Sequence, residues 1–504
     1  MSVTYPTIPD TVSIWKVISK DIVIIGTGFA GMGMAMKLKK SGRGDFVVLE
    51  KADDVGGTWR DNTYPGCECD IPSHMYSFSY EMNSEWSKSF SSQPEIWAYM
   101  RKVAEDHKLR ELIDFGVEVT GADWDEDRQR WTIHTNGETY DARVLVAGVG
   151  GLHIRNIPEI TGADTFAGAK FHSASWDHDV DLNGKKVVVI GTGASALQFI
   201  PIIAEEVGEL TVFQRTPSWV LPKKDKEIAG WMKAAFKTIP GAQRLYRNAI
   251  YWALESRALG FNGQINLLPI AEKIGKRHIR NAIKDPELVK KFTPEYRLGC
   301  KRVLQSNTYY QAFNRDNVEL NTDGIAEITA TGVVDKFGKT HDADVIIYGT
   351  GFHVIDAFDY LSIRGRGGRD LAKQFKEDGV ETYMGMTIHG FPNLYFMLGP
   401  NTALGHSSVV FMIEQQTKFI INMLKEMDGR GAVSAETTAE AQREFNDVIQ
   451  EKLEKGIWTQ GGCTSWYLDS QGKNRTIWPK FTFQYWWETR RVEGRDFEWK
   501  NKAA

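Results

Sequence analysis

Two glycine-rich segments of the chain have the spacing that a bound pyrophosphate requires. In this pattern the first glycine permits a tight turn, the second lets the backbone approach the phosphates, and the third lets helix and strand pack closely. The helix that follows offers free N–H groups and the positive end of its dipole to the anion. The two segments read Gly26-Thr27-Gly28-Phe29-Ala30-Gly31 and Gly191-Thr192-Gly193-Ala194-Ser195-Ala196, the latter with an accepted alanine in the third position.

The residues that follow each segment distinguish the two sites. Glu50, followed by Lys51, lies 19 residues beyond Gly31, where an acid can accept hydrogen bonds from ribose hydroxyls. Arg215, followed by Thr216, lies 19 residues beyond Ala196, where a guanidinium can pair with a 2′-phosphate that an acid would repel. The first site therefore suits a dinucleotide with a free ribose diol, and the second suits NADP. The simplest chemistry that needs both is hydride transfer from NADPH to a bound flavin, and FAD would then take the first site.

The elements that must position these segments follow the βαβ pattern. Short apolar runs rich in β-branched residues precede both motifs, at 21–25 and 185–190, and predict buried parallel strands. Further strands are expected at 46–49, 143–148, 210–213, 344–348 and 392–400, and helices at 411–428 and 436–455. We therefore predict an α/β fold with two Rossmann-like dinucleotide-binding domains. The FAD-binding domain would comprise residues 1–150 and 381–504, the NADP-binding domain 151–224 and 301–380, with a helical insertion at 225–300.

Composition excludes several classes of protein. The 61 Lys and Arg residues nearly balance 65 Asp and Glu, so there is no electrostatic reason to expect a nucleic-acid partner. No apolar run is long enough for a transmembrane helix, and the N-terminus lacks a signal-peptide pattern. Four cysteines in 504 residues do not predict a disulfide framework. We expect a cytoplasmic, multidomain protein whose oligomeric state the sequence leaves open.

A third motif lies between the two nucleotide-binding units. It has the form F-x-G-x-x-x-H-x-x-x-W-D, with Phe166, Gly168, His172, Trp176 and Asp177. Together with the glycine motifs it resembles the fingerprint of the Baeyer–Villiger monooxygenases, flavoproteins that convert ketones into esters or lactones. Other matching segments extend over nearly the whole chain: Val55-Gly56-Gly57-Thr58-Trp59, Cys69-Asp70-Ile71-Pro72-Ser73, Gly299-Cys300-Lys301-Arg302 and Cys463-Thr464-Ser465-Trp466-Tyr467.

The resemblance implies a reaction and a set of residues. NADPH would reduce FAD, dioxygen would form a C4a-peroxyflavin, and one oxygen atom would be inserted beside the carbonyl of a ketone, or transferred to a sulfide. Arg302 matches the active-site arginine, and Asp70 the carboxylate that orients it. Lys301 would face the NADP phosphate with Arg215 and Thr216. The remaining expected cofactor contacts are Thr58, Trp59, Tyr76, Trp466 and position 118, in the run Val117-Glu118-Val119.

Several of these residues have simpler interpretations. Lys301-Arg302 taken alone reads as a solvated basic pair, and Trp466 as an interface anchor. Considered by itself, His172 reads as a buried histidine satisfied by the backbone; the family relates it to domain movement rather than to a chemical base. Cys67-x-Cys69 fits neither a flavin disulfide reductase, which uses a wider spacing, nor a zinc site, which needs two further ligands. No metal is expected.

Three rival functions remain at this stage. A flavin-dependent N- or S-oxygenating monooxygenase has a similar linker motif, generally without the Trp176-Asp177 ending. An NADPH-linked flavin reductase or oxidase would produce only hydrogen peroxide. A non-catalytic nucleotide-binding protein could keep the fold, although Asp70 and Lys301-Arg302 speak against it.

Overall fold

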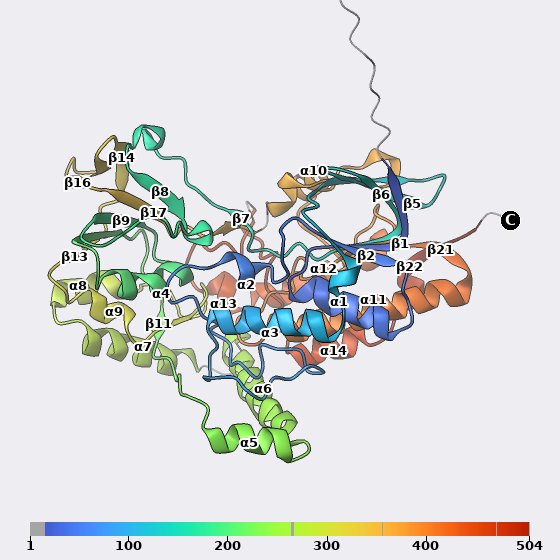
Figure 1. Ribbon diagram of the computed structural model, residues 1–504, viewed down its shortest axis with the longest axis horizontal. Coiled ribbons are helices and arrows are strands. Elements are labelled where there is room, and N and C mark those ends of the chain that lie inside the picture. The colour runs from blue at the N-terminus through green and yellow to red at the C-terminus, as the bar shows by residue number, and fades with distance from the viewer. Residues whose placement is uncertain (1–15, 264–266, 355, 470, 503–504) are drawn as a thin grey trace, which may run out of the picture.

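The computed structural model describes residues 16–263, 267–354, 356–469 and 471–502. Residues 1–15, which the sequence assigns to the first unit, lie outside the described residues. The chain forms two main sheets that lie toward opposite ends of the long axis, with helices between and below them (Figure 1). The mixed α/β fold with parallel sheets confirms the predicted fold class.

The first sheet is built around a parallel core. The first strand pairs in parallel with the second strand and with the sixth, so that Ile24 lies beside both Val48 and Val146. The predicted return of the chain to this sheet is confirmed, because the strand at 394–396 pairs in parallel with the sixth. The elements are β1 (Val17–Ile25), α1 (Phe29–Lys40), β2 (Phe46–Glu50), α2 (Thr58–Asp61), α3 (Gln93–Asp106), β3 (Ile113–Phe115), β6 (Thr139–Ala147) and β20 (Leu394–Phe396).

Three further strands extend this sheet through two antiparallel pairings and one parallel pairing. The strands β4 (Val119–Asp125) and β5 (Arg130–Thr135) pair with each other, and β5 pairs with β6. The edge strand β19 (Ser362–Arg364) pairs with β4, and the following helix α10 (Leu371–Glu377) packs on the same core. The sequence assigns residues 301–380 to the second unit. This strand nevertheless belongs to the first sheet, so the chain returns to the first unit before residue 381.

The second sheet is entirely parallel and has the order β13-β10-β9-β17-β8. Its central strand β9 precedes the second glycine motif, as predicted. A small antiparallel sheet packs against it through Ile328 and Val333. The elements are β8 (Ala169–His172), β9 (Lys186–Ile190), α4 (Ala194–Ile203), β10 (Glu209–Phe213), α9 (Tyr309–Ala312), β13 (Val318–Asn321), β14 (Ile325–Thr329), β15 (Gly332–Asp335), β16 (Thr340–Asp342) and β17 (Val345–Tyr348).

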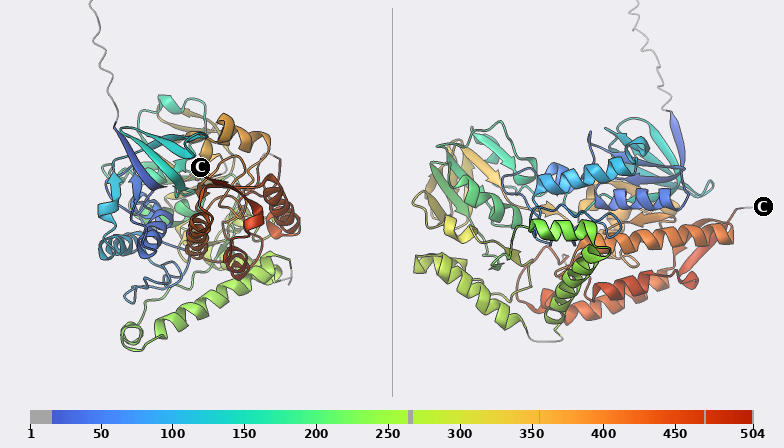
Figure 2. Two further views of the ribbon diagram at one scale, coloured as in Figure 1. Left: turned by 90° about the vertical axis from the view of Figure 1, so that its right-hand side faces the viewer. Right: turned by 60° about the horizontal axis from the view of Figure 1, so that its bottom comes forward.

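Helices dominate the rest of the chain. The described residues of 225–300 form four helices, of which α5 and α6 project from the lower side of the molecule (Figures 1 and 2). The long helix α11 packs on α1 and α14, and so joins the C-terminal segment to the first sheet. The elements are α5 (Gly230–Thr238), α6 (Ala242–Phe261), α7 (Leu268–Ala282), α8 (Pro286–Phe292), α11 (Val409–Arg430), α12 (Ala439–Glu454), α13 (Ile457–Gln460), α14 (Thr482–Thr489), and the strand pairs β7 (Ile154–Arg155) with β18 (Phe352–His353), β11 (Val220–Leu221) with β12 (Leu304–Gln305), and β21 (Ala432–Thr437) with β22 (Phe497–Asn501).

Candidate active site

A cavity of about 1760 Å³ lies between the two nucleotide-binding units. Both glycine motifs line it, as do segments of the helices at 225–300 and of the C-terminal part. Pockets for one small ligand usually span roughly 300–1,000 Å³. The volume and the two motifs therefore suit two dinucleotides together with a substrate.

The turn at Gly26 to Gly31 leaves room for a phosphate where the motif requires it. Gly26 has φ +90°, and a Cβ at Gly31 would lie 1.8 Å from the Gly26 carbonyl oxygen, so larger residues are excluded at both positions. A Cβ at Gly28 would meet nothing within 4 Å, which leaves the backbone open to the cavity. No side chain caps the N-terminus of α1, so its first N–H groups are available to an anion. Phe29 and Ala30 are buried at the start of this helix.

Glu50 is fixed at the end of β2 by several donors. The Thr27 amide and hydroxyl donate to Oε2 at 3.0 and 2.6 Å. The Ala52 amide donates to Oε1 at 3.0 Å, and Arg60 forms an ion pair at 3.1 Å with the same oxygen. These contacts fix the carboxylate at the cavity wall, in the position expected for a ribose contact, with remaining lone pairs able to accept from hydroxyls.

The other expected flavin contacts surround the same part of the cavity. Lys51, Thr58, Trp59 and Tyr76 all line it. The Trp59 indole donates to the Tyr76 hydroxyl at 3.1 Å, and burial raises the pKa of Tyr76, so this phenol stays protonated. Position 118 is occupied by Glu118, which is exposed and lines the cavity together with Val117 and Val119.

The second glycine motif repeats the geometry of the first. Gly191 has φ +105°, and a Cβ there would lie 2.5 Å from the Gly349 carbonyl oxygen. Gly193 precedes α4, whose N-terminus also lacks a side-chain cap. Thr192 and Ala196 are buried, and Ala194 and Ser195 open partly toward the cavity. The backbone therefore presents a second site for a pyrophosphate.

Two cations gather beyond this turn, and neither forms an ion pair within the part of the chain that the structure describes. Arg215, Thr216 and Lys301 line the cavity. The pKa of Lys301 is lowered, mainly by burial and to a lesser extent by the positive charge of Arg215. Two cations placed side by side repel each other, and a phosphate between them would remove that repulsion. The cluster fits the 2′-phosphate of NADP.

Arg302 and Asp70 meet inside the cavity, as the sequence predicts. The Arg302 Nε and Nη2 both donate to the Asp70 Oδ2, at 3.1 and 2.5 Å. The negative charge of Asp70 raises the pKa of Arg302 above its already high value. The Arg302 side chain is 44% exposed, but it lines the cavity, so this surface is open to the cavity. Asp70 thus orients the Arg302 guanidinium, which presents a permanent positive charge to a bound ligand.

The sequence did not single out Tyr467, which lies beside this pair. Tyr467 is 2% exposed, and its ring packs 4.5 Å from that of Trp466, which also lines the cavity. Burial raises the pKa of Tyr467 to about 12, with Arg302 and Asp70 as charged neighbours. The sequence could have indicated Tyr467, because it directly follows Trp466 in the C-terminal motif.

A second charged residue near the cavity is buried. The Lys223 Nζ forms an ion pair with the Glu68 Oε1 at 2.6 Å, and no pattern in the sequence indicates this contact.

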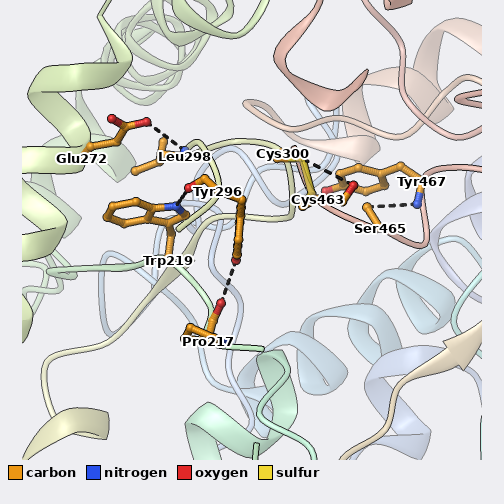
Figure 3. Close-up of a disulfide and its surroundings, with 9 residues drawn as sticks. All are labelled: Pro217, Trp219, Glu272, Tyr296, Leu298, Cys300, Cys463, Ser465 and Tyr467. Carbon is orange, nitrogen blue, oxygen red and sulfur yellow. Dashed lines mark hydrogen bonds between the residues drawn. A yellow bond between two sulfur atoms is a disulfide. The ribbon is translucent and has the colours of Figure 1, made fainter. Parts of the chain in front are cut away.

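A disulfide connects the two loops that carry Arg302 and Trp466. Cys300 and Cys463 are bonded across a separation of 163 residues (Figure 3). The first loop is also held by the Trp219 indole, which donates to the Tyr296 carbonyl at 2.9 Å, and by Glu272, which accepts from the Leu298 amide at 3.1 Å. The sequence predicted no disulfide framework, and no local spacing could have indicated this single long-range bond.

We expect loss of this disulfide to destabilise the protein. A bond that closes a long loop typically stabilises a fold by about 2–4 kcal/mol. Cys463→Ser should therefore lower the free energy of unfolding by about that amount, measured by denaturant titration under oxidising conditions. The oxidised wild-type protein should lose stability when a dithiol reductant is added, whereas the variant should not respond. Equal stability of the variant and the oxidised wild type would contradict the prediction.

The linker motif lies outside the cavity wall. His172 is 2% exposed; its Nε2 lies 3.0 Å from the Gly351 carbonyl oxygen, and its Nδ1 accepts from the Ala174 amide at 3.1 Å. Phe166 is buried, and a Cβ at Gly168 would clash with the Asp344 carbonyl oxygen at 2.2 Å. Trp176 packs 5.2 Å from Phe199 of α4, while Asp177 is exposed. These residues pack around β8 within the second unit. They are not placed for contact with substrate.

The neutral state of His172 makes stability depend on pH. Burial lowers the pKa of His172 to about 4, from an unfolded value near 6.5. The unfolded chain therefore takes up the proton first, so stability should fall as the pH decreases from about 6.5 to 4. Between pH 7 and 5 this group should cost about 2 kcal/mol. Urea titrations at both pH values should show a smaller loss for His172→Gln than for the wild type; an identical loss would disprove the assignment.

The remaining cysteines and possible metal ligands offer no further chemistry. Cys67 and Cys69 are free and buried, and burial raises the pKa of Cys67 to about 12. Within residues 16–263, 267–354, 356–469 and 471–502, no group of His, Cys, Asp or Glu side chains is arranged to hold a metal ion.

Comparison with known proteins decides the family. A family model described as pyridine nucleotide-disulphide oxidoreductase matches residues 23–256. A Baeyer–Villiger monooxygenase of Pseudomonas aeruginosa is 46% identical over 92% of this chain and 88% of its own. One of Streptomyces coelicolor is 44% identical over 95% of this chain and 92% of its own. This chain belongs to the Baeyer–Villiger monooxygenase family.

Solved structures agree with the family assignment. Cyclohexanone monooxygenase from Rhodococcus sp. Phi1 bound to NADP⁺ has a TM-score of 0.85 at 30% identity, covering 97% of this chain and all of its own. An OTEMO complex with FAD and NADP has a TM-score of 0.86 at 28% identity, covering 95% of this chain and 99% of its own. Like its family, the protein is a flavoprotein monooxygenase that uses FAD and NADPH. Among the described residues, no helix is both long and apolar enough to cross a bilayer.

Proposed function

We propose that this monooxygenase inserts one oxygen atom from dioxygen next to the carbonyl of a small ketone, giving an ester or a lactone. The observation that carries the proposal is the Arg302–Asp70 pair, which lies in a cavity shared by both nucleotide motifs. When bound and reduced by NADPH, FAD supplies the electrons that activate dioxygen. The chain must then hold the ketone nearby and stabilise negative charge on the reacting oxygen atoms.

Arg302 is suited to stabilise that charge. Its guanidinium cannot lose its proton in the protein, and Asp70 fixes its orientation through two hydrogen bonds to one oxygen. The Tyr467 phenol beside the pair stays protonated, because its pKa is raised to about 12. It therefore adds no negative charge that would compete with the reacting oxygens for Arg302.

The space beside these groups fits an apolar substrate. Trp466 lines the cavity, and the cavity wall also includes apolar side chains from the helices at 225–300 and from the C-terminal part. These residues are Phe261, Leu267, Leu268, Ile274, Leu298 and Leu398. These apolar side chains suit the hydrocarbon part of a ketone or a sulfide, whose burial against them is favourable.

Product identification across a panel of substrates tests the proposal. Linear, cyclic and aromatic ketones should yield esters or lactones with NADPH consumed in proportion to product. An amine and a thioether in the same panel test the N- or S-oxygenating alternative. Efficient amine oxygenation without ester formation from any ketone would overturn the proposal.

A further inference from the structure

Large apolar side chains are exposed on one part of the molecule. Trp231 of α5 is 73% exposed, Leu245 and Trp252 of α6 are 72% and 59% exposed, and Trp487 of α14 is 56% exposed. We call the exposed surface of α5, α6, α7 and α14 the insertion face. Its other exposed apolar residues are Ile239, Leu267, Ile270, Ile274, Phe483 and Trp486.

The four helices make this surface continuous. Phe236 of α5 packs 5.3 Å from Tyr246 of α6. The Tyr251 hydroxyl of α6 lies 3.0 Å from the Thr482 hydroxyl of α14. The last turn of α6 lies against the first turn of α7, since a Cβ at Gly260 would lie 3.9 Å from Leu268. All four helices lie along the lower side of the molecule (Figures 1 and 2).

The same region is strongly basic. Residues 225–300 contain 14 Lys and Arg against seven Asp and Glu, a net charge of +7 in a chain whose net charge is −4. On α7, four exposed cations lie close in sequence to the exposed Ile270 and Ile274. None of these cations has an acidic partner within ion-pair distance among the described residues. These cations are Lys273, Lys276, Arg277 and Arg280.

We propose that the insertion face docks on the surface of an anionic phospholipid bilayer. Exposed tryptophan and aliphatic side chains enter the boundary between headgroups and acyl chains, while Lys and Arg pair with the lipid phosphates. The charge selects this partner over a second copy of the chain, because two such faces would bring the unpaired cations of α7 against each other.

Docking would cover an apolar edge of the cavity. Leu267 and Ile274 line the cavity and are also exposed on the insertion face. An apolar ketone dissolved in the bilayer would then reach the cavity along these side chains. This consequence rests on the proposed function, whereas the docking itself does not.

Vesicle flotation of the full-length holoenzyme tests the docking. The protein should float with phosphatidylcholine vesicles that contain phosphatidylglycerol, should remain unbound with pure phosphatidylcholine, and should be released at high salt. Blue-shifted tryptophan fluorescence on the anionic vesicles should accompany binding. Equal binding to both vesicle types, or to neither, would overturn the proposal.

Paired variants locate the surface. Lys273→Gln with Arg277→Gln, and separately Trp252→Ser with Trp487→Ser, should each weaken binding to the anionic vesicles by at least about tenfold. Phe337→Ser with Lys373→Gln removes an exposed aromatic side chain and a cation elsewhere, and should leave binding unchanged. Unchanged anaerobic reduction by NADPH shows that each variant is folded, independently of ketone oxidation. Two results would contradict the proposal. One is a wild-type dimer that dissociates in the variant carrying Trp252→Ser with Trp487→Ser; the other is binding to heparin without binding to vesicles.

Discussion

Replacing Arg302 with alanine should separate flavin reduction from oxygen insertion. The variant should still be reduced by NADPH at a rate within a few-fold of the wild type, because Arg215 and Lys301 remain to hold the cofactor. Ester formation should fall by about 100- to 1,000-fold, the usual cost of removing one group that stabilises a developing oxyanion. Stopped-flow absorbance of the flavin together with product analysis measures both steps.

Two further variants show whether charge or orientation matters at this position. Arg302→Lys keeps the charge but loses the planar donor pair, so it should recover only part of the ester formation. Asp70→Asn keeps the size of its side chain but removes the negative charge that orients Arg302. It should lower ester formation with little effect on reduction. Normal oxygenation in Arg302→Ala would show that the charge near the reacting atoms comes from another group.

Removing the cations at the second nucleotide site should abolish the preference for NADPH over NADH. Arg215 and Lys301 line the cavity side by side, and the lowered pKa of Lys301 reflects burial and their mutual repulsion. Each charge-assisted contact to a phosphate contributes about 1.5–3 kcal/mol, so each alanine substitution should lower kcat/KM for NADPH by about 10- to 100-fold. The value for NADH should stay nearly constant, because NADH lacks the 2′-phosphate.

Steady-state kinetics with both nucleotides on each variant measure this discrimination. Arg215→Lys is the matched control: it retains a cation without the bidentate fork, and should lose less than Arg215→Ala. Glu50→Gln changes the first site, so it should impair FAD retention without altering the ratio of kcat/KM for NADPH to kcat/KM for NADH. Comparable kcat/KM for NADPH and NADH in the wild type would show that these two residues do not read the phosphate.

The parts of this structure that sequence could predict are those with local signals. The strand, glycine turn and helix around Gly26 and Gly191 are contiguous in the chain, so spacing and residue type identify them. The acid at Glu50 and the cation at Arg215 follow at a fixed distance for the same reason. The meeting of Asp70 and Arg302 came from the family resemblance, since their separation carries no local pattern.

What the sequence could not predict depends on contacts between distant segments. The Cys300–Cys463 bond, the pairing of β19 with β4, and the burial of Lys223 against Glu68 all join residues whose own neighbourhoods look ordinary. The insertion face is a similar case. The helical spacing at 225–300 predicted helices, but only the packing of α6 against α14 shows which apolar residues are left exposed.

The fate of dioxygen in the purified holoenzyme tests the central claim most directly. A reaction with NADPH, a ketone that the panel identifies as a substrate, and isotopically labelled dioxygen should place one labelled atom in the ester for each NADPH consumed. The other labelled atom should appear in water. NADPH consumption that yields only hydrogen peroxide, with no label in any product across the ketone panel, would contradict the account.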